Sequence, residues 1–203
     1  QTTGNYTIQP SGSSFTYYRV ENQTADDFLF PTAWGLDIGG DINIGKSGNT
    51  GDLDIQQQLS AGGDITIYGG DVDIHNNLYA TGAGSNITVY ANLNIHTATT
   101  ANVQIHSGDV SVTGGDIKLI SDVDGNATGN IHFGHGLYMN SHGGNILLAG
   151  GDVNGSGYAS GYITSSFENE GIRFEYTTQI ESEGGNITMR GRNTTNVVAS
   201  GYG

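Results

Sequence analysis

Two features of this sequence have residue types and spacings that could support chemistry. The stretch Gly40–Ser47 reads GDINIGKS and fits the nucleotide-binding pattern G-x-x-x-x-G-K-[ST] at every fixed position. The pairs Asp52/Asp54 and Asp71/Asp73 each place two carboxylates two residues apart, which is one face of an extended strand. Two carboxylates about 5 to 10 Å apart are what glycoside hydrolysis requires. Either chemistry depends on the elements that carry these residues.

The surroundings of Gly40–Ser47 do not suit a phosphate loop. Such a loop needs a helix directly after it, because the helix N-terminus and nearby main-chain N–H groups hold the phosphates. The residues that follow Ser47 are Gly-Asn-Thr-Gly-Asp, which disfavour a helix of useful length. We therefore interpret this stretch as a strand followed by a turn that contains Lys46.

The same strand unit recurs along the chain. It consists of a small residue, then Asp or Asn, then an apolar, a variable and a second apolar residue, and it occurs twelve times. Two apolar residues that flank a variable one predict a short strand with one buried side. The units begin at Gly40, Gly51, Gly63, Gly70, Ser85, Ala91, Ala101, Gly108, Gly115, Gly129, Gly144 and Gly185.

The Asp and Asn positions of these units reveal a longer period. Five of them and the aligned Asp152 lie 23, 22, 23, 21 and 22 residues apart, which gives a period of about 22 residues. The strands of one period cannot bury their apolar faces alone, so successive periods must stack as coils. The sequence therefore predicts an all-β fold, a parallel β-helix (β-solenoid) with roughly seven coils over residues 36–203. The six positions are Asp41, Asp64, Asn86, Asp109, Asn130 and Asp152.

We expect this column of Asp and Asn to form a ladder at one corner of the coils. From Asp64 onward acids and amides alternate, which separates the carboxylates and lets the amides bridge between them. The alternative is a row of calcium ions at Asp64, Asp109 and Asp152, which would need several converging carboxylate oxygens. The Gly-Asp nonapeptide of calcium-binding solenoids is absent. We therefore prefer the ladder and expect no cofactor.

The repeat also offers a structural explanation for the other chemical groups. Aspartates at exposed strand positions form an acidic, solubilising face, so the pairs at Asp52/Asp54 and Asp71/Asp73 are only weak candidates for catalysis. The histidines lack a further ligand at fixed spacing, which favours surface imidazoles over a zinc or nickel site. They are His75, His96, His106, His132, His135 and His142.

The composition limits the partners. The formal net charge is −14, with 20 Asp and Glu against six Lys and Arg. A chain this acidic lacks the basic patch that nucleic acid requires and is not attracted to an anionic membrane surface. No run approaches the roughly 20 apolar residues of a membrane-spanning helix. We therefore expect neither nucleic-acid binding nor membrane insertion.

Two segments depart from the repeat. Residues 1–35 contain both prolines and the single tryptophan. We expect them to cap the solenoid or to extend onto a neighbouring molecule, since a terminal coil otherwise exposes an apolar face and free strand edges. Residues 153–183 are rich in Gly, Ser and Tyr and predict irregular coils with a protruding loop. Aromatic candidates for assembly or ligand binding are Tyr17, Tyr18, Phe28, Phe30 and Trp34.

Several units resemble the repeats of large filamentous-haemagglutinin-type exoproteins, which are secreted by the two-partner route. The resemblance lies in Gly62–Ile67, Gly143–Leu148 and above all Gly171–Met189, and it extends over about residues 36–203. It implies a right-handed parallel β-helix, secretion across a bacterial outer envelope, and a role in adhesion or an extracellular matrix. The secretion-domain motifs of that family are not evident in residues 1–35, and the family has no shared catalytic residues to assign here.

Three function classes follow from these observations. The first is a non-catalytic extracellular adhesin or cell-surface rod that binds a host or neighbouring cell surface, or a glycan, through its solenoid surface or loops. The second is a subunit of a self-assembling extracellular filament, whose partners are copies of itself. The third is a carbohydrate-active β-helix enzyme that uses the aspartate pairs.

Overall fold

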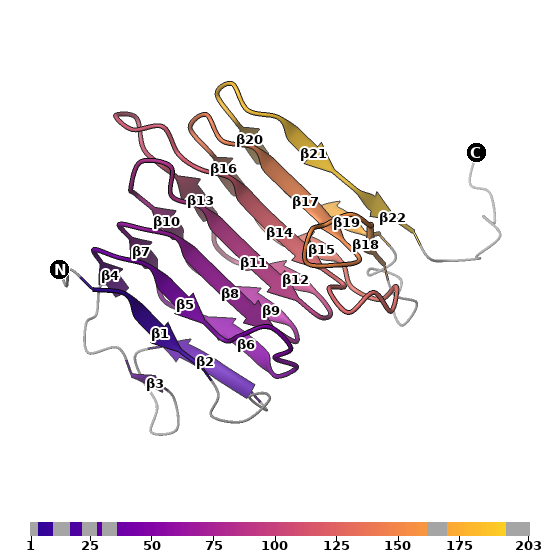
Figure 1. Ribbon diagram of the computed structural model, residues 1–203. Helices are drawn as coiled ribbons and strands as arrows, with labels where there is room; N and C mark the ends of the chain where they lie inside the picture. The colour runs from indigo at the N-terminus through magenta and orange to yellow at the C-terminus, as the bar shows by residue number, and fades with distance from the viewer. Residues whose placement is uncertain (1–3, 10–16, 22–27, 30–35, 162–169, 194–203) are drawn as a thin grey trace.

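The protein is a parallel β-helix, as the repeat predicts. The computed structural model describes residues 4–9, 36–161 and 170–193, and the main chain of residues 17–21 and 28–29. These residues form 22 strands in successive coils, stacked from β1 at one end to β21 at the other (Figure 1). The described residues include no helix long and apolar enough to cross a membrane.

Three parallel sheets form the walls of the solenoid, and each coil from β5 to β20 contributes one strand to each. Sheet 1 contains β1 (Tyr6–Ile8), β5 (Ile42–Ile44), β8 (Ile65–Gly69), β11 (Ile87–Ala91), β14 (Ile117–Ser121), β17 (Ile146–Gly150) and β21 (Ile187–Met189). Sheet 2 contains β3 (Phe28–Leu29), β2 (Tyr17–Glu21), β6 (Asp52–Ile55), β9 (Val72–Ile74), β12 (Ile95–Thr97), β15 (Ile131–Phe133) and β19 (Ile172–Phe174). Sheet 3 contains β4 (Leu36–Ile38), β7 (Leu59–Ala61), β10 (Leu78–Ala80), β13 (Val103–Ser107), β16 (Leu137–Asn140) and β20 (Thr178–Glu181). Outside them, β18 (Ala159–Ser160) pairs with β22 (Gly191–Arg192).

The core consists of apolar rows that run along the solenoid axis. In sheet 1 the strand register places Ile65, Ile87 and Ile117 directly above one another, and all three are fully buried. The residue between two apolar positions of a strand points outward, because successive side chains alternate across a strand. Burial of these rows supplies the main driving force for stacking the coils.

One loop covers part of the outer face of sheet 1. Ile120 and Ala149 occupy the outward row that begins with Tyr68 and Tyr90, yet both are fully buried. The loop of residues 151–158 lies over them, and a Cβ added to Gly155 would come within 3.2 Å of Ala149. Arg190 fixes the loop by donating from Nη1 to the Gly155 carbonyl oxygen, at 2.7 Å.

The solenoid begins before residue 36. β1 already pairs in parallel with β5, so residues 6–8 form the first strand of sheet 1. Within 1–35, the residues 1–3, 10–16, 22–27 and 30–35 lie outside the described part of the chain. Phe30 and Trp34 are therefore outside it, and only the main chain of Tyr17, Tyr18 and Phe28 is described, in β2 and β3.

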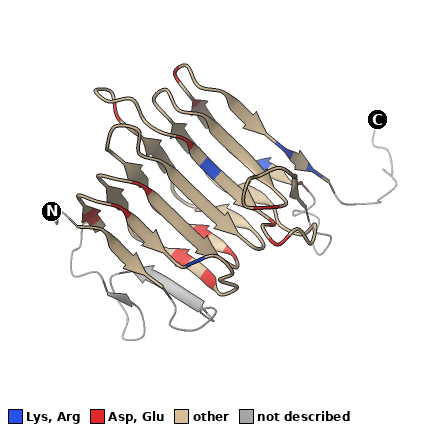
Figure 2. Ribbon diagram, viewed as in Figure 1, with Lys and Arg blue, Asp and Glu red and all other residues tan. Residues whose placement is uncertain are grey.

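Charge is distributed unevenly along the axis (Figure 2). Four of the six Lys and Arg follow residue 117, whereas the described acidic residues occur in both halves. The four are Lys118, Arg173, Arg190 and Arg192.

Candidate binding site

The corner before sheet 1 carries a ladder of Asp and Asn side chains. Asp41 accepts the main-chain N–H of Asp64 on Oδ1 at 3.0 Å, and Asp64 accepts that of Asn86 at 2.8 Å. The ladder starts one coil earlier than expected, since Asn5 accepts the N–H of Asp41 at 3.0 Å. These side chains therefore satisfy N–H groups that the turn leaves unpaired.

Beyond Asn86 the ladder does not follow the period of about 22 residues. Asn86 accepts from Asp116 at 2.8 Å, Asp116 from Asn145 at 3.0 Å, and Asn145 from Asn186 at 3.0 Å. The sequence interpretation was wrong for Asp109, Asn130 and Asp152, because loops inserted into the later coils shift the register. The strict alternation of acid and amide is lost as well, since Asn145 and Asn186 are consecutive members.

The three displaced residues have other roles. Asn130 belongs to a second ladder, before sheet 2, in which Asp52, Asp71 and Asn94 each accept the N–H of the next member at 2.9 to 3.0 Å. Asp109 closes its own turn by accepting from the N and Oγ atoms of Ser111, both at 2.6 Å. These hydrogen bonds lower the pKa of Asp109.

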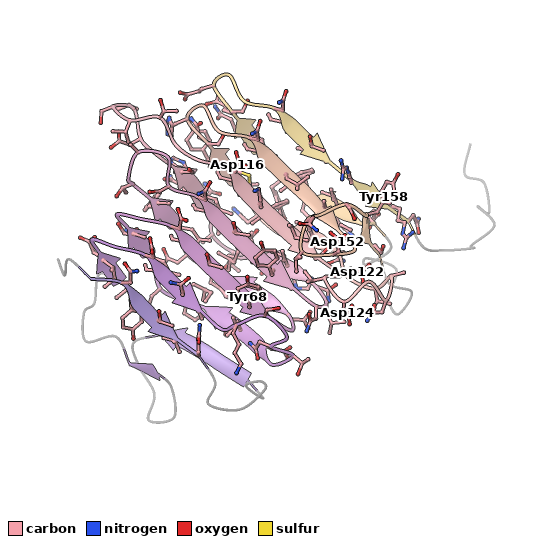
Figure 3. All side chains as sticks on the ribbon, in the orientation of Figure 1. Tyr68, Asp116, Asp122, Asp124, Asp152 and Tyr158 are labelled. Atoms are coloured by element: carbon pink, nitrogen blue, oxygen red, sulfur yellow. The ribbon has the colours of Figure 1, made fainter. Side chains whose placement is uncertain are left out.

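Asp152 also serves its own loop. It accepts the main-chain N–H of Asn154 at 2.8 Å, and hydrogen bonds from Ser156 and Asn154 lower its pKa. Figure 3 shows Asp152 and Tyr158 on the loop at the face of sheet 1, near Asp122 and Asp124, and Gly151 donates to the Asp122 carbonyl oxygen at 3.1 Å. Asp64 lies in the first ladder, so the three residues proposed for a calcium row have separate environments. Among the described residues, no three His, Asp or Glu side chains are arranged to hold a metal ion.

The aspartate pairs are engaged in structural contacts. Asp52 and Asp71 belong to the second ladder, and burial raises the pKa of Asp71. Asp54 lies 3.3 Å from His75 Nε2, and Asp73 lies 3.3 Å from His96 Nδ1. Four cavities bounded by described residues are lined by side chains other than these aspartates.

Imidazoles continue this acidic row along the outer face of sheet 2. The rings of His96 and His132 meet edge to face at 5.8 Å, and His132 Nε2 lies 3.1 Å from Glu175 Oε1. Burial lowers the pKa of His96, but the hydrogen bond and charge of Asp73 outweigh it, and the net effect is a raised pKa. Burial lowers the pKa of His132. The row therefore combines carboxylate–imidazole contacts with an edge-to-face contact between two imidazole rings.

A groove of about 350 Å³ lies at the corner where sheet 2 turns into sheet 3. It spans three consecutive coils, at the starts of β13, β16 and β20. Three strands at a spacing of about 4.8 Å extend over about 10 Å, the length of a disaccharide. Its polar and aromatic lining residues are Asn102, Gln104, His135, Tyr138, Tyr176, Thr177 and Gln179.

Aromatic rings and amides are held in place within this groove. The ring of His135 stacks on Tyr176 with centroids 4.9 Å apart, and His135 Nδ1 lies 2.9 Å from Asn102 Oδ1. Tyr138 donates from its hydroxyl to Glu181 at 3.2 Å. Tyr176 remains 60% exposed, so much of its surface is available to a ligand.

The amides of the groove keep hydrogen-bonding capacity. Gln104 uses Oε1 to accept from the Tyr79 hydroxyl at 2.7 Å, and Gln179 uses Nε2 to donate to Glu181 at 2.7 Å. Gln104 Nε2 and Gln179 Oε1 have no partner among the described residues and can bind hydroxyl groups. The residues that line the groove include no Asp, Glu, Lys or Arg.

Sequence reasoning did not assemble this groove. In the sequence, His135 is one of six histidines and Tyr176 is a tyrosine of the irregular segment, and nothing there indicates that the two are neighbours. Tyr138 and Gln179 are register partners 41 residues apart, almost two of the periods expected from the sequence. The signal that could have found the groove is that offset, which the ladder shows again between Asn145 and Asn186.

A comparison of the chain with protein-family models, with curated proteins and with solved structures found no match.

Proposed function

We propose that this protein is a non-catalytic extracellular rod that recognises a neutral saccharide on a cell or matrix surface. The observation that carries the proposal is the groove of Tyr138, Tyr176, His135 and the amides of Gln104 and Gln179 across three coils. An exposed aromatic ring offers an apolar face to the C–H side of a sugar ring, while amides hydrogen-bond its hydroxyls. The uncharged lining favours a neutral ligand.

A binding role is favoured over hydrolysis by the distribution of carboxylates. Hydrolysis needs two carboxylates at the scissile bond, and the residues that line the groove contribute none. The candidates Asp54 and Asp73 instead pair with histidines on sheet 2. A stiff solenoid suits the same role, because stacked coils hold a surface groove at a fixed geometry without a separate domain.

Ligand-observed NMR with a panel of neutral hexose and N-acetylhexosamine oligosaccharides tests the proposal. We expect saturation transfer to one or more of these sugars, and its loss in Tyr176→Ala, because that ring supplies the exposed stacking surface of the groove. Tyr158→Ala is the matched control, since Tyr158 is 50% exposed and lies outside the groove. Equal binding by the Tyr176→Ala variant and the parent, or no binding to any sugar of the panel, would contradict the proposal.

A further inference from the structure

A second groove, of about 350 Å³, lies on the outer face of sheet 1 beside the loop of residues 151–158. It crosses three neighbouring coils, at β14, β17 and β21, which extend over about 10 Å along the axis. Figure 3 shows Asp116, which precedes β14, and Asp152, which lies on the loop, on this face of the sheet. A further coil would stack beside β21 rather than over its outer face, so the groove belongs to the side of the solenoid. This sheet 1 groove has a polar lining that includes Asp116, Lys118, Asn145, Asn154, Thr188 and Arg190.

The sheet 1 groove contains two of the six Lys and Arg of an acidic chain. Lys118 shares an outward row with its register partner Leu147 and with Thr188. Arg190 lies two residues after Thr188 and donates to the loop on the same face, so both basic side chains are on one side of sheet 1. Among the described residues that line the groove, Asp116 is the one carboxylate. The groove therefore has more cations than carboxylates, in contrast to the chain as a whole.

The carboxylate of Asp116 is already engaged by protein donors. Its Oδ1 accepts from the main-chain N–H and from Nδ2 of Asn145, both at 3.0 Å. Its Oδ2 lies 3.3 Å from Lys118 Nζ. The ammonium group of Lys118 carries three N–H donors and its side chain is 40% exposed, so it can bind a second anion from the solvent side.

Arg190 presents an edge of its guanidinium group that suits a carboxylate. Nη1 donates to the Gly155 carbonyl oxygen at 2.7 Å, which holds the side chain against the loop. Nε and Nη2 have no partner among the described residues, and together they form a fork that binds both oxygens of a carboxylate. The side-chain amide of Asn154 and the hydroxyl of Thr188, likewise without a partner in the described part of the chain, can bind hydroxyl groups.

We propose that the sheet 1 groove binds an acidic saccharide and holds the carboxylate of a uronate residue between Arg190 and Lys118. Nε and Nη2 of Arg190 each donate to one carboxylate oxygen, and Nζ of Lys118 donates to the same group. Asn154 and Thr188 bind hydroxyls of that sugar or of the next one. A uronate matches this lining because it carries a carboxylate and several hydroxyls on one ring, whereas an acidic side chain of a peptide offers the carboxylate without the hydroxyls.

This inference is independent of the proposal for a neutral saccharide. The groove of Tyr138 and Tyr176 lies at the corner between sheets 2 and 3, and the described residues that line it include no Asp, Glu, Lys or Arg. The sheet 1 groove lies on a different wall of the solenoid and selects its ligand by charge. Either site can therefore be tested without the other.

NMR titration of the isotope-labelled chain with uronate trisaccharides, at low ionic strength, tests the proposal. The panel contains the galacturonate, glucuronate and mannuronate trimers, each beside its methyl ester, which keeps the hydroxyls and lacks the charge. We expect at least one trimer to bind and to shift the amide signals of Leu147 and Thr188, which lie in the groove. Its ester should bind about tenfold or more weakly, because it loses the charged hydrogen bonds. No binding by any trimer, or equal binding by acid and ester, would overturn the proposal.

Single substitutions test the two basic residues. Lys118→Gln removes one positive charge from an exposed side chain and leaves the chain folded, and Arg190→Lys keeps the charge but lacks the fork. We expect each variant to bind the trimer about tenfold more weakly than the parent. Lys46→Gln is the matched control, since it removes the same charge from the turn after β5, outside the groove, and should bind as the parent does.

Two further outcomes would contradict the site. Equal losses of affinity in Lys46→Gln and Lys118→Gln would indicate attraction by net charge alone. Triglutamate bound as tightly as the trimer would show that the groove does not select a saccharide. Either result overturns the proposal.

Discussion

The Oδ1 atom of Asn86 lies 2.8 Å from the main-chain nitrogen of Asp116, which is 30 residues further along the chain. This bond belongs to a ladder in which each Asp or Asn side chain accepts the first N–H of the next coil. The acceptor oxygens point at protein N–H groups, so hydrogen bonding accounts for the column of acidic and amide residues. The ladder adds side-chain hydrogen bonds to the main-chain bonds that join the coils at this corner, such as the one from Ile42 N–H to the Asp64 carbonyl oxygen at 2.8 Å.

Asn86 offers a direct test of the ladder. Asn86→Ala removes the acceptor for Asp116 N–H and the donor to Asp64 Oδ1, and we expect it to lower the free energy of unfolding by about 1 to 3 kcal/mol. Asn43→Ala, on the outer face of β5, should change it by less than about 0.5 kcal/mol. Urea denaturation of both variants measures the difference. Equal stability of the two variants would rule out an energetic role for the ladder.

The coil register can be tested in the core. Ile87 is fully buried, between Ile65 and Ile117, so Ile87→Asp places an unpaired carboxylate in the apolar row. We expect a loss of about 4 kcal/mol or more in the free energy of unfolding. The neighbouring Thr88→Asp points outward and should cost far less. Thermal and urea unfolding, monitored by circular dichroism, measures the stability of both variants. Equal stability of the two variants would contradict the register.

Neutralising either of two aspartates should change the free energy of unfolding at pH 7, in opposite directions for the two residues. Burial raises the pKa of Asp122, although N–H donors from Ala127 and Thr128 partly offset it. A carboxyl whose pKa is higher in the folded than in the unfolded state stabilises the fold at low pH, and that stability is lost as the pH rises through the folded pKa. Asp122→Asn should therefore raise the free energy of unfolding at pH 7.

Asp116 is the matched comparison. Burial raises its pKa, but hydrogen bonds from Asn145 and the ion pair with Lys118, 3.3 Å away, outweigh it and leave the pKa lowered. Its stabilising contribution is present above the unfolded pKa and lost as the pH falls through the folded pKa. Asp116→Asn should lower the free energy of unfolding at pH 7. Urea denaturation at pH 7 measures both changes in the free energy of unfolding. Changes of the same sign for the two variants would contradict the opposite pKa shifts assigned to Asp122 and Asp116.

The histidines of sheet 2 should titrate in a defined order. We expect NMR to find the pKa of His96 above 6.5 and that of His132 below 6.5, in line with their contacts. The His96 contribution to stability is fully present below its unfolded pKa and is lost as the pH rises through its folded pKa; that of His132 has the opposite dependence. Asp73→Asn should lower the pKa of His96, because it removes the charge 3.3 Å from Nδ1. An unchanged His96 titration in this variant would contradict the pairing.

The fold was predictable because the pattern that indicates it lies within each short strand unit. Every strand unit carries two apolar residues around a variable one, and Ile65, Ile87 and Ile117 could each be assigned to the buried side of a strand from that alternation alone. The repeat also required stacking, because a single coil of this length cannot enclose a core. The groove was not predictable, since Tyr138 and Gln179 become neighbours only when the strands that carry them are paired.

The sequence by itself determined the coil, its inward rows and the use of Asp and Asn at a corner, since alternation and turn preference act between residues a few positions apart. The tertiary structure decided which coils are neighbours. From Asp41 onward, successive ladder members are 23 and 22 residues apart up to Asn86, and then 30, 29 and 41 apart, because loops such as 151–158 are inserted between strands. Such a loop lengthens a coil without altering the strands on either side, so Asp109 and Asp152 match the local pattern but lie in turns. The register then follows from burial of the apolar rows, which depends on the whole stack rather than on sequence distance.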